Sequence, residues 1–306
     1  MNILELFLVY SQYYYKYSGC SIICINIKNM QKQILSFDKT KINYDIVRKK
    51  GNTGVLIFLH GVGGDLLAWS KERSFFHKQG ISTLAIDLRG HGKSDRPKKI
   101  GDYELDKFAK DVFEVLREEK IKDFIIVGHC FGAMVSTVFH SFSPKLAQAY
   151  IFIDTTYKGP KEIRYFFKLN KFFLLIMNYL LEKKKTKKRD FEHADFEKYI
   201  GTGDWNIPRI FSDITHTTFK SWIFTYQQVA NYDALEIMKN IKQKVLIIEG
   251  EKDSLIKMVD AEKIKSLVKN SELNVIPEAN HILVLNNPEE LQKEIFEFIK
   301  GFKDFC

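Results

Sequence analysis

The amino-acid sequence predicts an α/β fold with a mostly parallel central sheet flanked by helices. Short runs rich in Val, Ile, Leu and Phe alternate with stretches in which apolar residues recur at helical spacing. Strands that alternate with helices in this way typically form a parallel sheet. Residues 157–240 break the alternation, because they are rich in aromatic residues and lysine and contain no convincing strand. We interpret this interval as an inserted helical lid.

The individual elements follow from these patterns. The apolar runs, which we interpret as buried parallel strands, lie at residues 33–37, 42–47, 55–59, 82–87, 124–128, 149–154, 244–250 and 273–277. Helical patterns lie at residues 106–119, 134–142, 261–270 and 288–302. In the first of these helices one face carries Phe108, Val112, Val115 and Leu116. We therefore expect a core made of residues 30–156 and 241–306, with the lid, residues 157–240, between its two parts.

The first 29 residues do not fit this pattern. The segment ILELFLVY is too short to span a bilayer and contains Glu5, and it lacks the cationic start of a secretory signal. A regular pattern begins at Met30. We expect the natural chain to start there, with residues 1–29 a doubtful extension that is disordered or never made.

Charge and cysteine content exclude several classes of protein. The formal net charge is +9, but the run KKKTKKR at residues 183–189 contributes six positive charges and the remainder is only +3. We interpret that run as a solvated connection, and no nucleic-acid-binding motif accompanies it. Four cysteines in 306 residues are too few for a disulfide scaffold and fit a reducing compartment. The sequence thus predicts a cytoplasmic protein without a nucleic-acid partner.

The segment VGHCFGA, residues 127–133, has the frame of a nucleophile elbow, Gly-x-Ser-x-Gly, with Cys130 in place of the serine. A nucleophile on a sharp turn between strand and helix has strained backbone angles and requires small neighbours, which Gly128 and Gly132 supply. The turn places Cys130 at a helix N-terminus, where the positive end of the helix dipole favours a thiolate over a thiol. The motif predicts Cys130 as the nucleophile, although a small buried cysteine is the simpler alternative.

The segment FLHGVGGD directly follows a predicted strand. Its glycines let backbone amides turn towards a reacting carbonyl, and we predict an oxyanion hole made by the amides of Val62 and Phe131. His60 in the same segment is expected to be structural.

A base and an acid for this nucleophile lie farther along the chain. His281 lies in the loop between the last strand and the last helix, and Asp253 lies just beyond the preceding strand. We predict His281 as the general base towards Cys130, oriented by Asp253. Asp154 also ends a strand and is an alternative source of the carboxylate.

The chain order nucleophile, acid, histidine is the order of the α/β-hydrolase fold. From about Ile34 to its C-terminus the sequence resembles the α/β-hydrolase superfamily, in its lid-bearing branch. The resemblance extends to DLRGHGKSD (residues 87–95), which is similar to the family's loop after the fourth strand of the full sheet. It extends also to FSPKLAQAYIFIDTT (residues 142–156), which is similar to the family's run from a helix-ending proline into the next strand. The cysteine departs from the usual serine and resembles the arrangement of dienelactone hydrolases and polyhydroxyalkanoate synthases.

Other conspicuous residues receive structural or binding roles. His129 is expected to pack beside the elbow, and Asp87, Arg89 and His91 are expected to brace their loop. Some of the lid's aromatic residues are expected to line an apolar acyl pocket. The candidates are Phe166, Phe167, Phe172, Phe173, Trp205, Trp222 and Tyr226. Contact of the basic, amphipathic lid with a membrane is the less favoured alternative.

Together these predictions indicate a hydrolase of carboxylic esters or thioesters that uses a Cys-His-Asp triad and a covalent acyl-thioester intermediate. Its expected partner is a small acyl substrate, and no cofactor or metal is expected because the sequence contains neither a metal-ligand cluster nor a phosphate-binding loop. An acyltransferase with the same triad and a non-catalytic binding protein of the same fold remain alternatives. The sequence does not predict the oligomeric state.

Overall fold

The computed structural model describes residues 31–51, 53–184 and 191–305. The prediction for residues 1–29 and most of that for the KKKTKKR run fall outside these ranges. In the described part of the chain, no helix combines the length and the hydropathy that a bilayer crossing requires.

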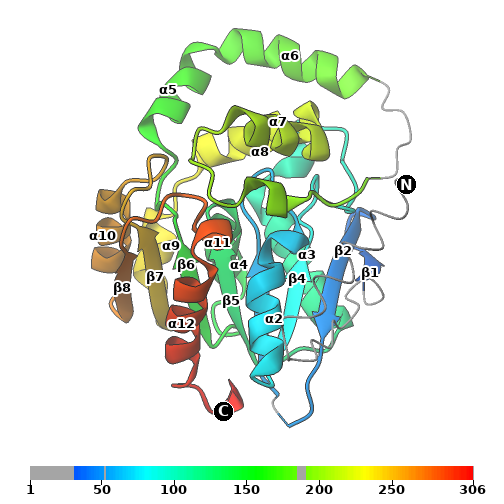
Figure 1. Ribbon diagram of the computed structural model, residues 1–306. Helices are drawn as coiled ribbons and strands as arrows, with labels where there is room; N and C mark the ends of the chain where they lie inside the picture. Colours follow the sequence, from blue (N-terminus) through cyan, green and yellow to red (C-terminus); the bar gives the residue numbers. More distant parts are fainter. Residues whose placement is uncertain (1–30, 52, 185–190, 306) are drawn as a thin grey trace, which may run out of the picture. The chain divides into compact units, whose positions relative to one another are not determined.

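A single eight-stranded sheet forms the centre of the fold, with strand order β1-β2-β4-β3-β5-β6-β7-β8 (Figure 1). Pairing is parallel from β4 through β3 to β8 and antiparallel for β1 with β2 and for β2 with β4. The strands are β1 (Gln31–Leu35), β2 (Lys41–Val47), β3 (Val55–Leu59), β4 (Ser82–Ile86), β5 (Phe124–His129), β6 (Ala149–Ile153), β7 (Lys244–Gly250) and β8 (Ser271–Ile276). The predicted α/β fold with a mostly parallel sheet is confirmed.

The prediction of eight buried parallel strands was wrong at the margins of the sheet. The first two strands run antiparallel, because a short turn between Leu35 and Lys41 joins them as a hairpin. The edge strands β1 and β8 are partly exposed, since each has a neighbour on one side only. The sequence QKQIL of β1 is accordingly mostly polar.

Helices cover both faces of the sheet and divide the core into two apolar clusters. One cluster contains side chains of α3, α4 and α10, and the other contains side chains of α2, α11 and α12. The predicted face of residues 106–119 is buried in the first cluster, as expected for α3. The core helices are η2 (Leu66–Trp69), α2 (Ser70–Lys78), η3 (Ile100–Tyr103), α3 (Leu105–Glu118), α4 (Phe131–Phe142), α10 (Met258–Leu267), α11 (Leu283–Asn286), α12 (Pro288–Ile299) and η5 (Lys303–Phe305).

Between β6 and β7 the described residues form helices and no named strand, apart from one isolated bridge between Lys158 and Asp233. The helices are α5 (Lys161–Leu169), α6 (Lys171–Lys183), η4 (Phe196–Tyr199), α7 (Ile207–Thr217), α8 (Phe219–Asn231) and α9 (Leu235–Asn240). Figure 1 shows that this α5–α9 segment lies largely beyond the carboxyl ends of the parallel strands.

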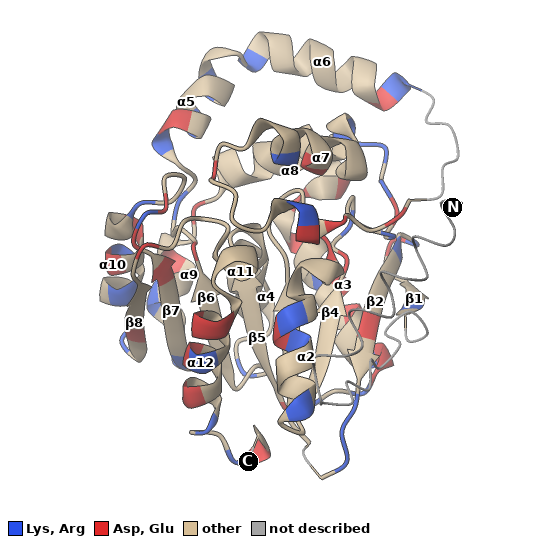
Figure 2. Cartoon of the chain, in the orientation of Figure 1, with Lys and Arg blue, Asp and Glu red and all other residues tan. Residues whose placement is uncertain are grey.

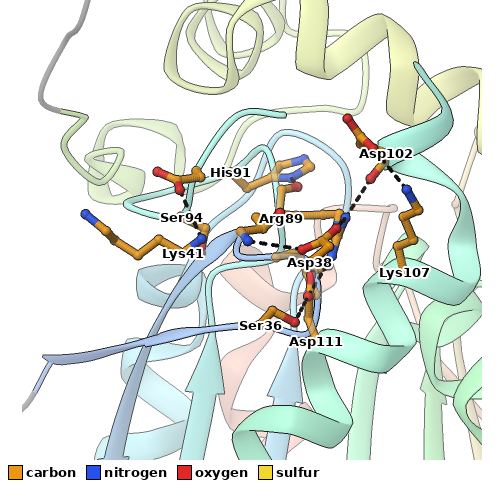
Figure 3. A network of polar contacts seen from close by, with 12 residues as sticks. Ser36, Asp38, Lys41, Arg89, His91, Ser94, Asp102, Lys107 and Asp111 are labelled. Atoms are coloured by element: carbon orange, nitrogen blue, oxygen red, sulfur yellow. Dashed lines mark hydrogen bonds and ion pairs between the residues drawn. The ribbon is translucent and has the colours of Figure 1, made fainter. Parts of the chain in front are cut away.

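A buried arginine braces the loop that follows β4 (Figure 3). The Arg89 guanidinium donates two hydrogen bonds of 2.7 Å to the Asp111 carboxylate of α3 and a third, of 3.0 Å, to Asp38. It also donates to the Asp102 carbonyl, and the Ser36 hydroxyl donates to Asp111. Since Arg89 and Asp111 are fully buried, the pair must keep its geometry to offset the cost of desolvation. This network fixes the loop of residues 87–95 beside the predicted site.

Candidate active site

Cys130 lies on the turn between β5 and α4 with backbone angles of φ 49° and ψ −109°. This left-handed conformation is strained for a residue with a side chain and is held by its surroundings. The Cys130 amide donates to the Ile153 carbonyl, and the Cys130 carbonyl accepts from the Ala133 amide. A Cβ on Gly128 would lie 2.5 Å from the Ala133 nitrogen, and one on Gly132 would lie 2.2 Å from the Leu59 carbonyl oxygen. The two elbow glycines are therefore required by close backbone packing.

The structure places His281 and Asp253 next to each other and next to Cys130. His281 Nδ1 lies 2.6 Å from Asp253 Oδ2, and the remaining ring nitrogen is the one left to hydrogen-bond with the Cys130 sulfur. The other Asp253 oxygen accepts from the amides of Leu255 and Ile256 at 2.7 and 2.8 Å. The turn after β7 thus holds the carboxylate in one orientation, as a group that orients a histidine requires.

The surroundings of His281 favour its protonated form. Burial alone would lower the pKa of His281, but the nearby Cys130 sulfur and the hydrogen bond that the His281 ring donates to Asp253 raise it well above the usual range. An imidazolium in this position is the natural counter-ion of a thiolate. The geometry therefore suits a thiolate–imidazolium pair.

Two backbone amides beside the sulfur have no partner within the described chain. Val62 follows β3 on the glycine-rich loop and lines the cavity that contains Cys130, while Phe131 opens α4. Neither amide donates a hydrogen bond to another described residue. Both are available to an oxygen atom of a bound ligand, as an oxyanion hole requires.

An apolar cavity of about 390 Å³ opens beside Cys130. This volume lies within the range of small-molecule sites. Its walls come from the loops after β3, β5, β7 and β8 and from the α5–α9 segment. The apolar side chains that line it include Met134, Ile163, Ile210, Val229, Leu255 and Ile282.

Three of the seven aromatic residues suggested for the pocket line this cavity, namely Trp205, Trp222 and Tyr226. The expectation that some of the seven would do so is confirmed, whereas Phe166, Phe167, Phe172 and Phe173, on α5 and α6, are not among the residues that line the cavity. Burial raises the pKa of Tyr226 above its usual range, and the proximity of Cys130 raises it further. Tyr226 therefore stays a phenol and can donate a hydrogen bond inside the cavity.

Asp204 links the loops that carry His281 and Asp253, and the sequence analysis missed it. One Asp204 oxygen accepts from the His281 amide at 2.9 Å, and the other accepts from the amide and the hydroxyl of Ser254 at 2.9 and 2.7 Å. Asp204 lies in the α5–α9 segment, far from both partners in sequence. The motif GDW gave no local signal of this role, because the contacts exist only after the chain has folded.

An ion pair also lines the cavity. The Arg209 guanidinium donates to Asp213 at 2.8 Å along α7 and also donates to the Asp204 carbonyl. Burial raises the pKa of Asp213 to about 7, although Arg209 opposes that shift. The cavity thus has a charged pair in its wall in addition to the polar groups around Cys130.

The neighbouring polar residues occupy supporting positions. The Asp154 side chain accepts from the Gly250 amide at 2.8 Å, and in this structure His281 hydrogen-bonds to Asp253 instead. His129 packs beside the elbow, and its Nε2 lies 2.9 Å from the His281 carbonyl oxygen. His60 Nε2 accepts from the Leu88 amide at 3.1 Å, a contact that joins two loops.

Residue types that could hold a metal also gather in three places among the described residues. The groups are His129, Asp154 and His281; Asp65, Asp87 and His193; and Asp154, Glu249 and Asp253. In the second group protein donors already occupy both carboxylates. The first and third groups overlap the Cys130 site, where His281 bonds directly to Asp253.

Comparison with known proteins agrees with the fold. Residues 54–288 match the family model described as alpha/beta hydrolase fold, and the chain therefore belongs to the α/β-hydrolase family. Human Protein ABHD8 is 23% identical over 80% of this chain, and the chain spans only 55% of that relative's length. Epoxide hydrolase 3 of Xenopus tropicalis is 24% identical over 80% of this chain and 71% of its own. An esterase from Exiguobacterium antarcticum has a similar fold, with a TM-score of 0.69 at 17% identity over 88% of this chain and 99% of its own.

Proposed function

We propose that this protein is a hydrolase of carboxylic esters or thioesters in which Cys130 is the nucleophile, His281 the general acid–base and Asp253 the residue that orients it. The observation that carries the proposal is the Asp253–His281 hydrogen bond close to Cys130, beside an apolar cavity. The strained elbow supports it, because strain of this kind persists where a side chain must be presented to a ligand.

In the first half of the reaction the Cys130 thiolate attacks the acyl carbonyl carbon and forms a carbon–sulfur bond. The amides of Val62 and Phe131 stabilise the resulting oxyanion. The tetrahedral intermediate then collapses, the bond to the leaving group breaks, and the His281 imidazolium gives its proton to the departing alcohol or thiol. An acyl thioester on Cys130 and a neutral His281 remain.

In the second half neutral His281 takes a proton from a water molecule, whose oxygen attacks the acyl-thioester carbonyl. Collapse of this second intermediate expels the Cys130 thiolate and releases the carboxylic acid. The products are one acid and one alcohol or thiol, and the thiolate–imidazolium pair is restored. Asp253 keeps the imidazole in the required orientation through both halves.

We further propose that the α5–α9 segment is a lid that helps to enclose the acyl group. Ile163, Trp222 and Val229 of this segment line the same cavity as Cys130. A wall of this composition favours an apolar acyl chain and excludes water from the thioester. The supporting observation is the shared lining of the cavity by core and inserted helices.

A cysteine nucleophile also determines which esters react fastest. A tetrahedral intermediate on sulfur expels the thiolate more readily than a poor alkoxide leaving group, so an alkyl ester mostly returns to substrate. Thioesters, aryl esters and enol esters carry better leaving groups, and we expect them to exceed matched alkyl esters in kcat/KM. A rate for ethyl acetate equal to that for phenyl thioacetate would contradict the assignment of a sulfur nucleophile.

The deciding experiment compares hydrolysis of p-nitrophenyl acetate and butyrate by the wild type, Cys130→Ala and Cys130→Ser. We expect Cys130→Ala to lose at least about 1,000-fold in kcat/KM. Iodoacetamide should abolish the wild-type rate and leave Cys130→Ser unaffected. Mass spectrometry of the quenched wild type should show one acyl group on Cys130.

Other outcomes separate the alternatives. Acyl enzyme that reacts faster with an added alcohol or thiol than with water would indicate an acyltransferase with the same triad. Wild-type inactivity across the acyl series, combined with activity of Cys130→Ser, would make the native protein a binding protein and would refute the hydrolase proposal.

A further inference from the structure

The helix α6 packs against the rest of the protein through one of its faces. Asn178 and Gln227 of α8 exchange two hydrogen bonds of 3.0 Å between their side-chain amides. Glu182 accepts from the Ile100 amide at 2.9 Å, Leu174 is buried, and Met177 and Leu181 pack against the first core cluster. Residues 174, 178 and 182 are each four positions apart and therefore share one face of the helix. This face points inward.

The opposite face of α6 is apolar and open to solvent. Phe172 is 77% exposed and Phe173 is 64% exposed, and the remaining exposed apolar side chains of α6 include Leu175, Ile176 and Leu180. Phe166 and Leu169 extend the surface onto α5. A helix on the surface of a globular protein normally carries its polar residues outward. The α5–α6 face, defined by these seven side chains, has the reverse pattern, and contiguous exposed apolar surface of this kind marks an interaction site.

Basic residues flank this apolar surface. From residue 161 to residue 184 the chain carries six lysine and arginine residues against two glutamates. Figure 2 shows blue segments on α5 and at both ends of α6, with an uncharged stretch between them. Arg164, Lys168 and Lys171 also border a hollow of about 620 Å³ between α5–α6 and α8. Neither Lys168 nor Lys171 forms an ion pair with a described carboxylate, whereas the charge of Arg164 acts on Asp233, which borders the same hollow.

We propose that the α5–α6 face binds the surface of a lipid bilayer that contains anionic phospholipids. Apolar side chains on such a face enter the boundary between headgroups and acyl chains, while flanking lysine and arginine residues contact the phosphates. A second copy of this chain fits less well, because two surfaces with the same positive charge repel each other. Pro160 and Ile163, at the start of α5, line the cavity that contains Cys130, so the docked bilayer lies beside a wall of that cavity.

Sedimentation with extruded vesicles tests this binding without any measurement of turnover. The full chain is mixed with vesicles of pure phosphatidylcholine or of 70:30 phosphatidylcholine and phosphatidylglycerol, at low and at moderate salt. We expect binding to the anionic vesicles that weakens as salt rises. The variant Phe172→Glu/Phe173→Glu should lower the partition coefficient at least about tenfold, because it removes two anchoring rings and adds two negative charges.

A matched control separates this local effect from a general effect of charge. Leu146→Glu/Val259→Glu makes the same change in charge at two exposed apolar residues on other parts of the core. It should bind vesicles almost as well as the wild type. Lys168→Gln/Lys171→Gln should lower binding to the anionic vesicles several-fold and leave the weak binding to phosphatidylcholine unchanged.

Three results would overturn the proposal. The wild type could fail to sediment with anionic vesicles, or both double glutamate variants could lose binding equally. Light scattering could instead show that Phe172→Glu/Phe173→Glu converts a dimer into a monomer in the absence of vesicle binding, which would assign the face to a second copy. Because both phenylalanines are exposed, the thermal unfolding midpoint should stay close to that of the wild type and exclude misfolding. Failure of the hydrolase proposal leaves these outcomes unaffected.

Discussion

Glu249 carries its carboxyl group into the interior of the protein from β7. Both of its carboxyl oxygens are buried and have no hydrogen-bond partner among the described residues. Burial, followed by the negative charges of Asp154 and Asp253, raises the pKa of Glu249 to about 10. Glu249 is therefore protonated at neutral pH. A neutral side chain here adds no second negative charge next to the Asp253 carboxylate, which hydrogen-bonds to His281.

This raised pKa predicts how stability depends on pH. The unfolded chain releases the Glu249 proton near 4.5, and the native protein keeps it up to about 10. The contribution of this group to the free energy of unfolding therefore falls as pH rises between these values, by up to about 1.4 kcal/mol per pH unit. Glu249→Gln should remove this loss, so its unfolding midpoint should exceed that of the wild type increasingly between pH 6 and pH 9.

Glu251→Gln is the matched control, because Glu251 lies in the exposed loop just after β7. Its unfolding midpoint should follow that of the wild type at every pH. If the difference in unfolding midpoint between Glu249→Gln and the wild type were the same at pH 5 and at pH 9, Glu249 would be ionised in the native protein and our assignment would be wrong.

At the scale of elements, Asp204 connects the loops after β7 and β8 through three hydrogen bonds. Loss of its carboxylate should let His281 and Asp253 drift relative to Cys130. For Asp204→Ala we expect kcat on p-nitrophenyl butyrate to fall about 10- to 100-fold with a much smaller change in KM, because a misplacement of about 1 Å is costly in a preorganised site. Steady-state kinetics measure both constants.

Partial rescue distinguishes this positioning role from a general loss of stability. Asp204→Asn keeps one oxygen acceptor and should recover part of the lost kcat, whereas Asp195→Ala, at an exposed residue of the same segment, should behave as the wild type. Equal losses in Asp204→Ala and Asp204→Asn at an unchanged unfolding midpoint would contradict the proposed role.

The elements of the core could be predicted because each local pattern agrees with the final fold. The run KVLIIEG, for example, forms β7 with the predicted bounds, and the elbow glycines are readable because backbone atoms leave no room for a side chain. The relation of Cys130 to His281 and Asp253 was predictable from chain order within a family. The contacts of Asp204 and the orientation of α6 could not be predicted, because both depend on packing between residues far apart in the sequence and leave no periodic pattern in it.

At the scale of the whole molecule, a buried contact attaches the α5–α9 segment to the core. His193 Nε2 lies 2.7 Å from Asp87 Oδ2, and the Ala194 amide donates to Asp65 at 2.7 Å. The hydrogen bond and negative charge of Asp87, with the charge of Asp65, raise the pKa of His193 although burial opposes the rise. Lys93, His60 and His91 are described basic or ionisable groups that face this cluster from the core.

His193→Gln should therefore weaken the attachment of the segment. A raised histidine pKa contributes stability that is complete below about 6.5 and is lost as pH rises through the folded-state value. The deficit of His193→Gln in free energy of unfolding should accordingly be about 1–3 kcal/mol near pH 6 and smaller near pH 9. Denaturant unfolding at the two pH values measures it.

His216→Gln provides the comparison, because among the described residues the His216 ring hydrogen-bonds only to Ser212 of its own helix. This substitution should change the free energy of unfolding little at either pH. If the free energy of unfolding that His193→Gln loses relative to the wild type were larger at pH 9 than at pH 6, the neutral imidazole would be the form that makes the contact.

The elbow geometry also bears on how the chain is made. The strands β3, β5 and β6, which contact the turn at Cys130, are synthesised before β7, β8 and the loop of His281. A nascent chain on the ribosome can therefore fold the turn while the sulfur still lacks its basic partner. Under the proposed mechanism, the sulfur would gain its basic partner only once β8 has added to the edge of the sheet, so a growing chain would present the elbow before the triad is complete.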